Sequence, residues 1–165
     1  MSTPEYRFLC DVMLRGLGRW LRAAGYDTRI AESTQADREL VREALTQQRL
    51  LLTRDRKILE IRNAKSCTCF IATNALDDWV CELNRTLDLD WCRAAFSRCM
   101  LCNTPLEIAP QALLERVPEQ SREHLQALLY CPQCQKPYWE GSHVRRMRAR
   151  LQEWNQLCKE SASRK

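Results

Sequence analysis

Short apolar runs alternate with stretches of helical periodicity through residues 1–95. The first run, 8–10, ends at Asp11, and the helical pattern that follows it stops at Gly25. The apolar run 50–53 leads in the same way to Asp55. Strands that alternate with helices indicate a parallel sheet with helices on both of its faces. The predicted strands are residues 8–10, 28–30, 50–53 and 69–72, and the predicted helices follow Asp11, open at Asp37, follow Asp55 through Ile61 and run through Leu83.

The pattern changes after Asp90. Residues 106–110 are expected to be extended, and Pro118 opens a segment whose leucines, Leu125, Leu128 and Leu129, predict a helix. A terminal helix is expected to have one apolar face, formed by Val144, Met147, Leu151 and Trp154. The expected divisions are an α/β domain at 1–95, a second domain at 96–158 and a disordered tail at 159–165.

Two C-x2-C pairs lie in this second part, Cys99 with Cys102 and Cys131 with Cys134. A C-x2-C turn lets two thiolates reach one zinc ion, and two such turns complete a tetrahedral site. Asn103 suits the tight turn that such a pair requires. A chance occurrence or disulfide pairing is the alternative. We expect a structural zinc site, because four thiolates leave no open coordination position for a substrate.

Aspartates fall near the ends of several predicted elements, where a parallel sheet brings its binding crevice. Clustered carboxylates repel one another unless a cation joins them, and their hard oxygen atoms suit Mg²⁺ or Mn²⁺. Such ions hold a phosphate oxygen and activate water, so the pattern predicts a phosphodiesterase site. Taken singly, each aspartate is typical of a helix cap or turn, and only their joint placement favours a metal. The candidates are Asp11, Asp37, Asp55 and either Asp77 or Asp78.

The formal net charge is +5, and most of the basic excess lies in the C-terminal part. Two groups of arginines stand out, and each indicates either a phosphate-binding surface or a solvated helix face. The C-terminal group has no acidic residue among its members. The groups are Arg15, Arg19 and Arg22 in the first predicted helix, and Arg145, Arg146, Arg148 and Arg150 in the last.

Several classes of protein are disfavoured by what the sequence lacks. No segment approaches the roughly 18 apolar residues of a bilayer span, and the first ten residues do not resemble a signal peptide. We therefore expect a cytoplasmic protein with no membrane partner, whose remaining cysteines are buried thiols. There is no P-loop, G-x-S-x-G or H-E-x-x-H motif, and the presence of only two histidines disfavours a histidine-dependent triad.

Five ordered segments carry a resemblance to a known family: Phe8 to Leu14, Trp20 to Asp27, Leu51 to Arg56, Cys99 to Asn103, and Cys131 to His143. Together they resemble the Mut-seven C-terminal ribonuclease family, over about Tyr6 to Leu151. The resemblance implies an α/β fold, with a PIN-like parallel sheet and flanking helices followed by a small C-terminal zinc ribbon and a terminal helix.

The resemblance also implies a metal-dependent ribonuclease whose acidic site falls on Asp11, Asp37 and Asp55. Asp78 is preferred to Asp77 as the fourth carboxylate, and Glu39 or Glu43 is the alternative to Asp37. We expect in-line attack of water on an RNA phosphodiester at a Mg²⁺ or Mn²⁺ site, leaving a 5′-phosphate and a 3′-hydroxyl. Asp11 and Asp55 are the expected main ligands.

The expected partner is RNA, single-stranded or tRNA-like. Arg54 and Lys57 are expected to neutralise phosphate charge, and His143 to contact RNA beside the two arginine groups, unless it only caps the terminal helix. Two other functions remain open: a non-catalytic zinc-ribbon RNA-binding or adaptor protein, and a partner-regulated, toxin-like tRNA nuclease.

Overall fold

The computed structural model describes residues 5–123 and 125–162. They fall into two compact units. The first contains the described residues up to Arg22 together with Tyr26–Leu89, and the second contains Ala23–Gly25 and the described residues from Asp90 onward.

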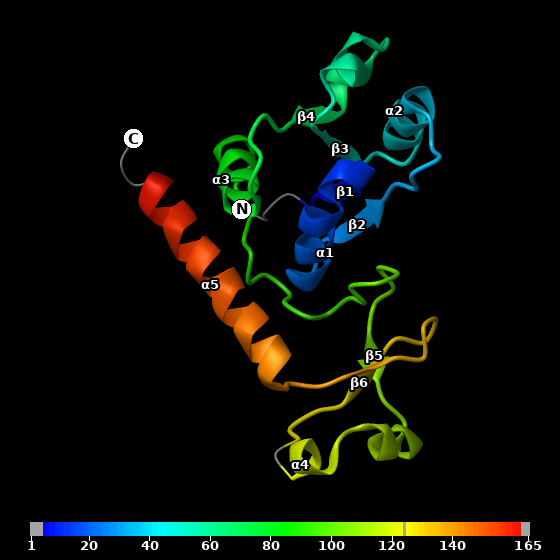
Figure 1. The fold of residues 1–165 in the computed structure, drawn as a ribbon, viewed down its shortest axis with the longest axis vertical. Coiled ribbons are helices and arrows are strands. Elements are labelled where there is room, and N and C mark those ends of the chain that lie inside the picture. Colours follow the sequence, from blue (N-terminus) through cyan, green and yellow to red (C-terminus); the bar gives the residue numbers. More distant parts are fainter. Residues whose placement is uncertain (1–4, 124, 163–165) are drawn as a thin grey trace. The chain divides into compact units, whose positions relative to one another are not determined.

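A four-stranded parallel sheet with the strand order β2-β1-β3-β4 forms the centre of the first unit (Figure 1). The α/β class expected from the sequence is confirmed. The strands are β1 (Arg7–Cys10), β2 (Asp27–Ile30), β3 (Leu50–Thr53) and β4 (Thr68–Phe70). The helices are α1 (Arg15–Ala23), α2 (Asp37–Thr46) and α3 (Leu76–Thr86), with short 3-10 helices η1 (Val12–Leu14), η2 (Arg56–Glu60) and η3 (Ala64–Ser66).

The two faces of this sheet pack against different helices. Leu9 and Leu51 pair in register on β1 and β3 and belong to a buried cluster with α2. The next residue of β1, Cys10, points to the opposite face because side chains alternate along a strand. A β-carbon added at Gly18 of α1 would lie 3.3 Å from the Cys10 Sγ and 2.8 Å from Ile30 Cγ1, so α1 lies close against that face. The α2 residues of the buried cluster are Leu40, Val41 and Ala44.

Gly25 ends α1, as its position after the helical pattern predicted. Its φ is +96°, in the left-handed region that glycine adopts without a steric penalty. The Tyr26 N–H donates to the Leu21 carbonyl at 2.9 Å, which is the long hydrogen bond of a Schellman turn. The turn lets the chain reverse directly from α1 into β2.

An ion network joins the N-terminal ends of three strands of the sheet. The Asp27 carboxylate accepts hydrogen bonds from Arg49 Nη1 at 2.9 Å and Nη2 at 3.2 Å, and from Arg7 Nε at 3.2 Å. Arg49 also donates to the Phe8 and Asp27 carbonyls. Its side chain is only 9 % exposed, against 44 % for that of Arg7. A single guanidinium therefore joins the starts of three strands.

We expect Arg49→Ala to lower the free energy of unfolding by about 2 kcal/mol, because it leaves Asp27 half-buried and short of its main partner. Arg7→Ala is the matched control and should cost less than about 1 kcal/mol, since its ion pair is exposed to water. Urea titration of both variants measures the difference. Equal losses would show that burial of Arg49 adds nothing to the network.

The second unit contains a three-stranded antiparallel sheet, ordered β5-β6-β7, and a long helix, α5 (Figure 1). The helix predicted from Pro118 is wrong in extent, because it ends at Arg122 and Leu129 lies in a strand that pairs with Ile108 and Tyr138. The elements are β5 (Glu107–Ile108), η4 (Gln111–Arg116), α4 (Glu119–Arg122), β6 (Leu129–Tyr130), β7 (Pro137–Tyr138) and α5 (Ser142–Ala162).

The apolar face predicted for the terminal helix is confirmed at Leu151 and Trp154, while Val144 and Met147 are half-buried. Leu151 and Trp154 are buried, and the Trp154 ring packs edge-on against that of Trp91 at a centroid distance of 5.3 Å. The helix α5 extends to Ala162, and residues 163–165 of the tail predicted at 159–165 lie outside the described residues. In the part of the chain that is described, no helix has both the length and the apolar character to cross a bilayer.

Candidate functional site

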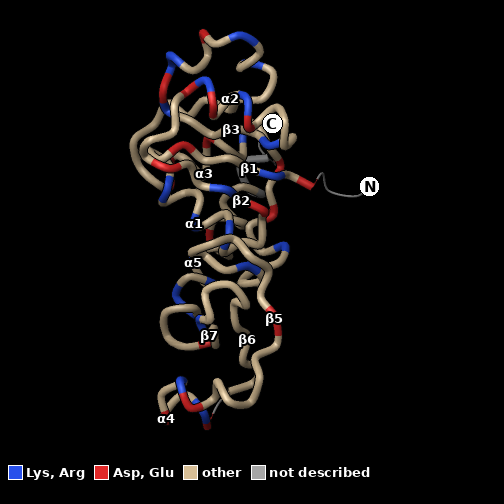
Figure 2. The backbone as a smooth tube through the Cα atoms, turned by 90° about the vertical axis from the view of Figure 1, so that its right-hand side faces the viewer, with Lys and Arg blue, Asp and Glu red and all other residues tan. Residues whose placement is uncertain are grey.

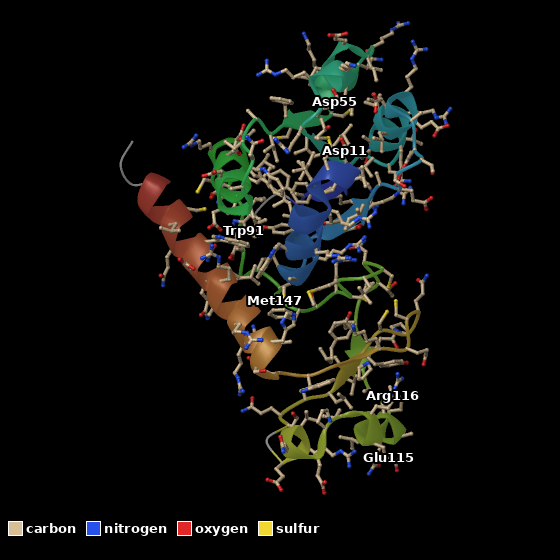
Figure 3. All side chains as sticks on the ribbon, in the orientation of Figure 1. Asp11, Asp55, Trp91, Glu115, Arg116 and Met147 are labelled. Carbon is tan, nitrogen blue, oxygen red and sulfur yellow. The ribbon has the colours of Figure 1, made fainter. Side chains whose placement is uncertain are left out.

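Asp11 and Asp55 follow neighbouring strands at one edge of the parallel sheet (Figure 3). The buried Thr53 connects them. Its hydroxyl donates to Asp11 Oδ2 at 2.7 Å and accepts the backbone N–H of Asp55 at 3.0 Å. Thr53 is thus hydrogen-bonded both to the Asp11 side chain and to the Asp55 backbone, and it links the two aspartates. Sequence reasoning missed Thr53, although a hydroxyl residue at the end of a strand, two positions before an aspartate, was the available signal.

Each of the two carboxylates also caps a 3-10 helix. Asp11 Oδ1 accepts the Met13 N–H at 3.4 Å, and Asp55 Oδ1 accepts the Lys57 N–H at 2.8 Å. The capping role that the sequence left open is therefore present together with the joint placement. Asp11 is 7 % exposed, so its oxygen atoms are largely withdrawn from water. Asp55 is less buried, and its Oδ2 has no hydrogen-bond partner among the described residues.

Asp37 and Asp78 lie in the first turns of α2 and α3, and both are exposed. These helices follow the two outer strands, β2 and β4. Asp77 is also exposed, so exposure does not separate it from Asp78. Within 5–123 and 125–162, no three carboxylates have ligand atoms within 4.8 Å of one another, so the structure does not gather the four aspartates into a closed group.

The two glutamates considered in place of Asp37 have partners of their own. Glu39 reaches back to the Ala36 N–H at 3.4 Å. Glu43 is bonded to Arg29, and its Oε2 accepts from Gln35 at 2.6 Å. Burial raises the pKa of Glu43, but these hydrogen bonds outweigh burial and hold it below the ordinary value. Both glutamates therefore have structural roles in α2.

Arg54, next to Asp55, is held by the segment that follows β4. Its guanidinium bonds to the Asn74 side chain and lies 5.8 Å from the centre of the Trp79 ring. Its Nε is buried and has no hydrogen-bond partner within the described residues. Arg54 is thus fixed beside the carboxyl ends of β3 and β4 with one donor unused.

Glu82, which sequence reasoning also missed, fixes that same segment from α3. Its carboxylate accepts from the Ala72 N–H at 3.0 Å and from the Thr73 hydroxyl at 2.9 Å. Burial raises its pKa, yet these hydrogen bonds lower it more, so the charged form is favoured. No signal in the sequence identifies this contact, because ten positions separate Glu82 from Ala72.

The four cysteines of the two C-x2-C pairs come together in the second unit. Their sulfur atoms all lie within 4.8 Å of one another, with Cys102 and Cys131 at 3.4 Å. This arrangement is compatible with a structural zinc ion, whose tetrahedral site requires four converging thiolates. None of the ten cysteines is in a disulfide.

The two pairs have the same backbone geometry. The residue after each pair, Asn103 or Gln135, has a positive φ, 73° and 55° respectively. Its N–H donates to the carbonyl of the first cysteine, at 2.9 Å for Asn103 and 2.8 Å for Gln135. The tight turn expected at Asn103 is confirmed, and the second pair repeats it.

Hydrogen bonds in the cysteine cluster favour the thiolate form of Cys102. Burial raises the pKa of Cys102, but bonds with Thr104 and with the Cys134 and Cys131 thiols lower it to about 6. The bond to Cys102 and burial raise the pKa of Cys134 to about 12. Tyr138 places its hydroxyl 3.0 Å from Cys99 Sγ, and burial and this bond raise the pKa of the tyrosine.

The model of one protein family, described as the Mut7-C RNAse domain, matches residues 6–151. The chain belongs to this family. No curated protein and no solved structure matched the chain. The Mut7-C RNAse match includes the four aspartates and the four cysteines, and it extends over parts of both units. Membership supports a ribonuclease-like role with RNA as the substrate.

Two groups of basic residues in this Mut7-C RNAse domain differ from the sequence prediction. Arg15 and Arg19 are exposed, but Arg22 is buried and donates from Nε to the Thr28 carbonyl at 2.7 Å, so it does not extend an exposed stripe. Burial also raises the pKa of the neighbouring Cys10 to about 12, although Arg22 opposes the change.

The sequence suggested that the C-terminal arginines have no acidic residue near them, but two of these arginines form ion pairs. Arg148 pairs with Glu140 at 3.0 Å and lies 5.0 Å from the centre of the Phe96 ring, and Arg150 pairs with Glu153 at 2.6 Å. His143, Arg145 and Arg146 are exposed on α5. The acids that pair with Arg148 and Arg150 are Glu140, which precedes α5, and Glu153, which lies three residues after Arg150.

Proposed function

We propose that this Mut7-C RNAse domain is a Mg²⁺- or Mn²⁺-dependent ribonuclease that hydrolyses RNA phosphodiester bonds at the sheet edge formed by β1 and β3. The observation that supports this most directly is the Asp11–Thr53–Asp55 arrangement in a chain of this family. A buried acid and a more exposed acid from adjacent parallel strands are placed where such sheets bind ligands.

The donor atoms at this edge fit a hard divalent cation. Mg²⁺ and Mn²⁺ prefer carboxylate oxygens, and Mg²⁺ is commonly held by one or two carboxylates while keeping several waters. Asp11 and Asp55 would hold the ion, and Asp37 and Asp78, on the first turns of α2 and α3, would hold or orient a second ion or water. When bound, the metal would polarise the scissile phosphate and lower the pKa of water.

The chain's own residues would orient the metal-binding carboxylates and neutralise the charge of the phosphate. The Thr53 hydroxyl donates to Asp11 Oδ2 and so fixes the orientation of that carboxylate. Arg54, which is fixed beside the carboxyl ends of β3 and β4, would neutralise phosphate charge, and Lys57 is exposed two residues after Asp55. The four cysteines would bind zinc in a structural role.

Cleavage of a labelled single-stranded RNA tests the proposal. The zinc-loaded protein should cut it in Mn²⁺ or Mg²⁺ and not in buffer without an added divalent ion. Analysis of the ends should find a 5′-phosphate and a 3′-hydroxyl. Metal-independent cleavage with a 2′,3′-cyclic phosphate would contradict the metal mechanism, whereas RNA binding with no cleavage would support a non-catalytic binding protein instead.

A further inference from the structure

A groove lies between α2 and the segment that follows Asp55, within the first unit. Its volume is about 780 Å³. From here on it is called the α2–η2 groove. It is lined by Arg38, Val41, Arg42, Leu45 and Thr46 of α2, and by Lys57, Glu60, Ile61 and Arg62 of and after η2.

The charged residues of this groove are basic with one exception. Arg38, Arg42, Lys57 and Arg62 are all exposed, and Glu60 is the one acid in the lining. No ion pair of these four side chains is found in the described part of the chain. Other arginines of the same unit are committed, since Arg7 and Arg49 contact Asp27 and Arg29 contacts Glu43.

Charge pairing, rather than the number of charges, therefore distinguishes the groove. Basic and acidic positions are interspersed along the backbone around α2 (Figure 2). Two of the three acids of α2 have other partners, since Glu39 contacts Ala36 and Glu43 contacts Arg29 and Gln35, while the third, Asp37, lies at the start of the helix. The four cations thus form no ion pair with a carboxylate in the described parts of the chain.

The floor of the groove is apolar. Val41 is buried, Leu45 is 40 % exposed, and Ile61 packs against the core cluster beneath α2. Cationic rims beside an apolar floor suit a single nucleic-acid strand, whose phosphates meet basic side chains while its bases contact apolar surface. A free inorganic anion would contact the basic side chains but make no contact with the apolar floor.

One end of the groove lies beside the candidate site. Arg38 follows Asp37 at the start of α2, and Lys57 is the residue whose N–H is bound by Asp55. From Arg38 to Thr46 the helix rises about 12 Å. A strand bound beside Asp55 could therefore continue along α2 past Lys57, Arg38 and Arg42.

We propose that the α2–η2 groove binds the phosphate backbone of the single-stranded RNA substrate as it leaves the Asp11–Asp55 edge. This assignment rests on the proposed ribonuclease function for the direction of the strand, but the binding itself does not require cleavage. Three of its four cations, Arg38, Arg42 and Arg62, are additional to the basic residues that the sequence pattern selected.

The test compares two full-length, zinc-loaded triple variants of equal net charge. The groove variant is Arg38→Gln, Arg42→Gln and Arg62→Gln. The control is Lys65→Gln, Arg85→Gln and Lys136→Gln, which removes three exposed cations outside the groove. Binding of a fluorescein-labelled single-stranded oligoribonucleotide is followed by anisotropy at several salt concentrations, without added Mg²⁺ or Mn²⁺.

The groove variant should bind about 30- to 100-fold more weakly at 0.1 M salt, and the slope of log K against log salt should fall by about 2, because three phosphate contacts on a single strand are lost. The control should change neither quantity by comparable amounts. Equal losses in both variants would overturn the proposal, since they would reflect net charge alone. Displacement of the RNA by polyglutamate of the same charge and concentration, as effectively as by unlabelled RNA, would assign the groove to acidic polypeptides and also overturn it.

A second readout separates this proposal from the proposed function. In Mn²⁺, the groove variant should cleave bis(p-nitrophenyl) phosphate as the unsubstituted protein does, because this small diester reaches only the sheet edge. With long RNA it should show a raised KM and an unchanged kcat. An unchanged KM of the groove variant for long RNA would overturn the groove assignment. If the unsubstituted protein showed no metal-dependent cleavage, the ribonuclease function would be overturned, but the binding result would still stand. Arg42→Glu alone serves as the second variant and should weaken RNA binding in the same direction.

Discussion

Asp11→Asn is expected to abolish metal-dependent RNA cleavage, with a loss in kcat/KM of about a thousandfold. The substitution replaces one of the two carboxylates that adjoin Thr53, a metal ligand in the proposed function, with an amide. A loss of this size corresponds to about 4 kcal/mol of transition-state stabilisation, which is within the contribution of a bound metal ion. Asparagine keeps the shape of the side chain and can still accept from Thr53, so the fold should persist.

Asp88→Asn is the matched control, because Asp88 is an exposed aspartate of the same unit whose side chain makes no hydrogen bond or ion pair with the described residues. It should retain full activity. Single-turnover cleavage and thermal unfolding of both variants are the measurements. Cleavage that survives in Asp11→Asn with an unchanged dependence on Mn²⁺ would remove Asp11 from the mechanism and point to a contaminating nuclease.

Cys102→Ser is expected to release zinc and destabilise the second unit by several kcal/mol. Structural zinc sites have apparent binding free energies of roughly 10–16 kcal/mol at neutral pH, and that energy is folding energy where the site forms only in the folded chain. The second sheet has strands of only two residues each, so it depends on the metal site more than a longer sheet would. Elemental analysis gives the zinc content, and circular dichroism on heating gives the stability.

Cys81→Ser provides the comparison, since Cys81 is exposed and lies outside the cysteine cluster. It should leave the zinc stoichiometry and the melting temperature unchanged. If Cys102→Ser also retained both, the cluster would not be a structural zinc site. The distinction does not depend on activity, so it holds even if the ribonuclease function fails its own test.

Local patterns were sufficient to predict the parallel sheet and the positions of its two central aspartates. The run 50–53 can be buried on both faces only as an inner strand, and Gly25 marks a helix end through its own backbone preference. The cysteine cluster could be predicted equally well, because the turn geometry of each C-x2-C pair is set within five residues. In each of these cases the information lies close together in the sequence.

Long-range partners could not be predicted in this way. The network of Asp27 with Arg49, the bond from Thr53 to Asp11 and the contact of Glu82 with Ala72 each join residues that are distant in the chain. The arginines show the same limit, since Arg22 and Arg19 look alike in a periodic pattern, yet only Arg22 meets the Thr28 carbonyl. The leucines after Pro118 failed as a helix signal because strand pairing outweighed their helical spacing.

The adjacency of β1 and β3 also determines when the candidate site can exist during protein synthesis. The strands pair although a complete β-strand, two α-helices and a short 3-10 helix lie between them in the sequence. Forming this pair requires closure of a long loop, and the entropy of that closure must be met before any contact across it is gained. A nascent chain that has not yet released β3 therefore has Asp11 without Thr53 or Asp55. Metal affinity at this edge should arise abruptly with the third strand rather than gradually with chain length.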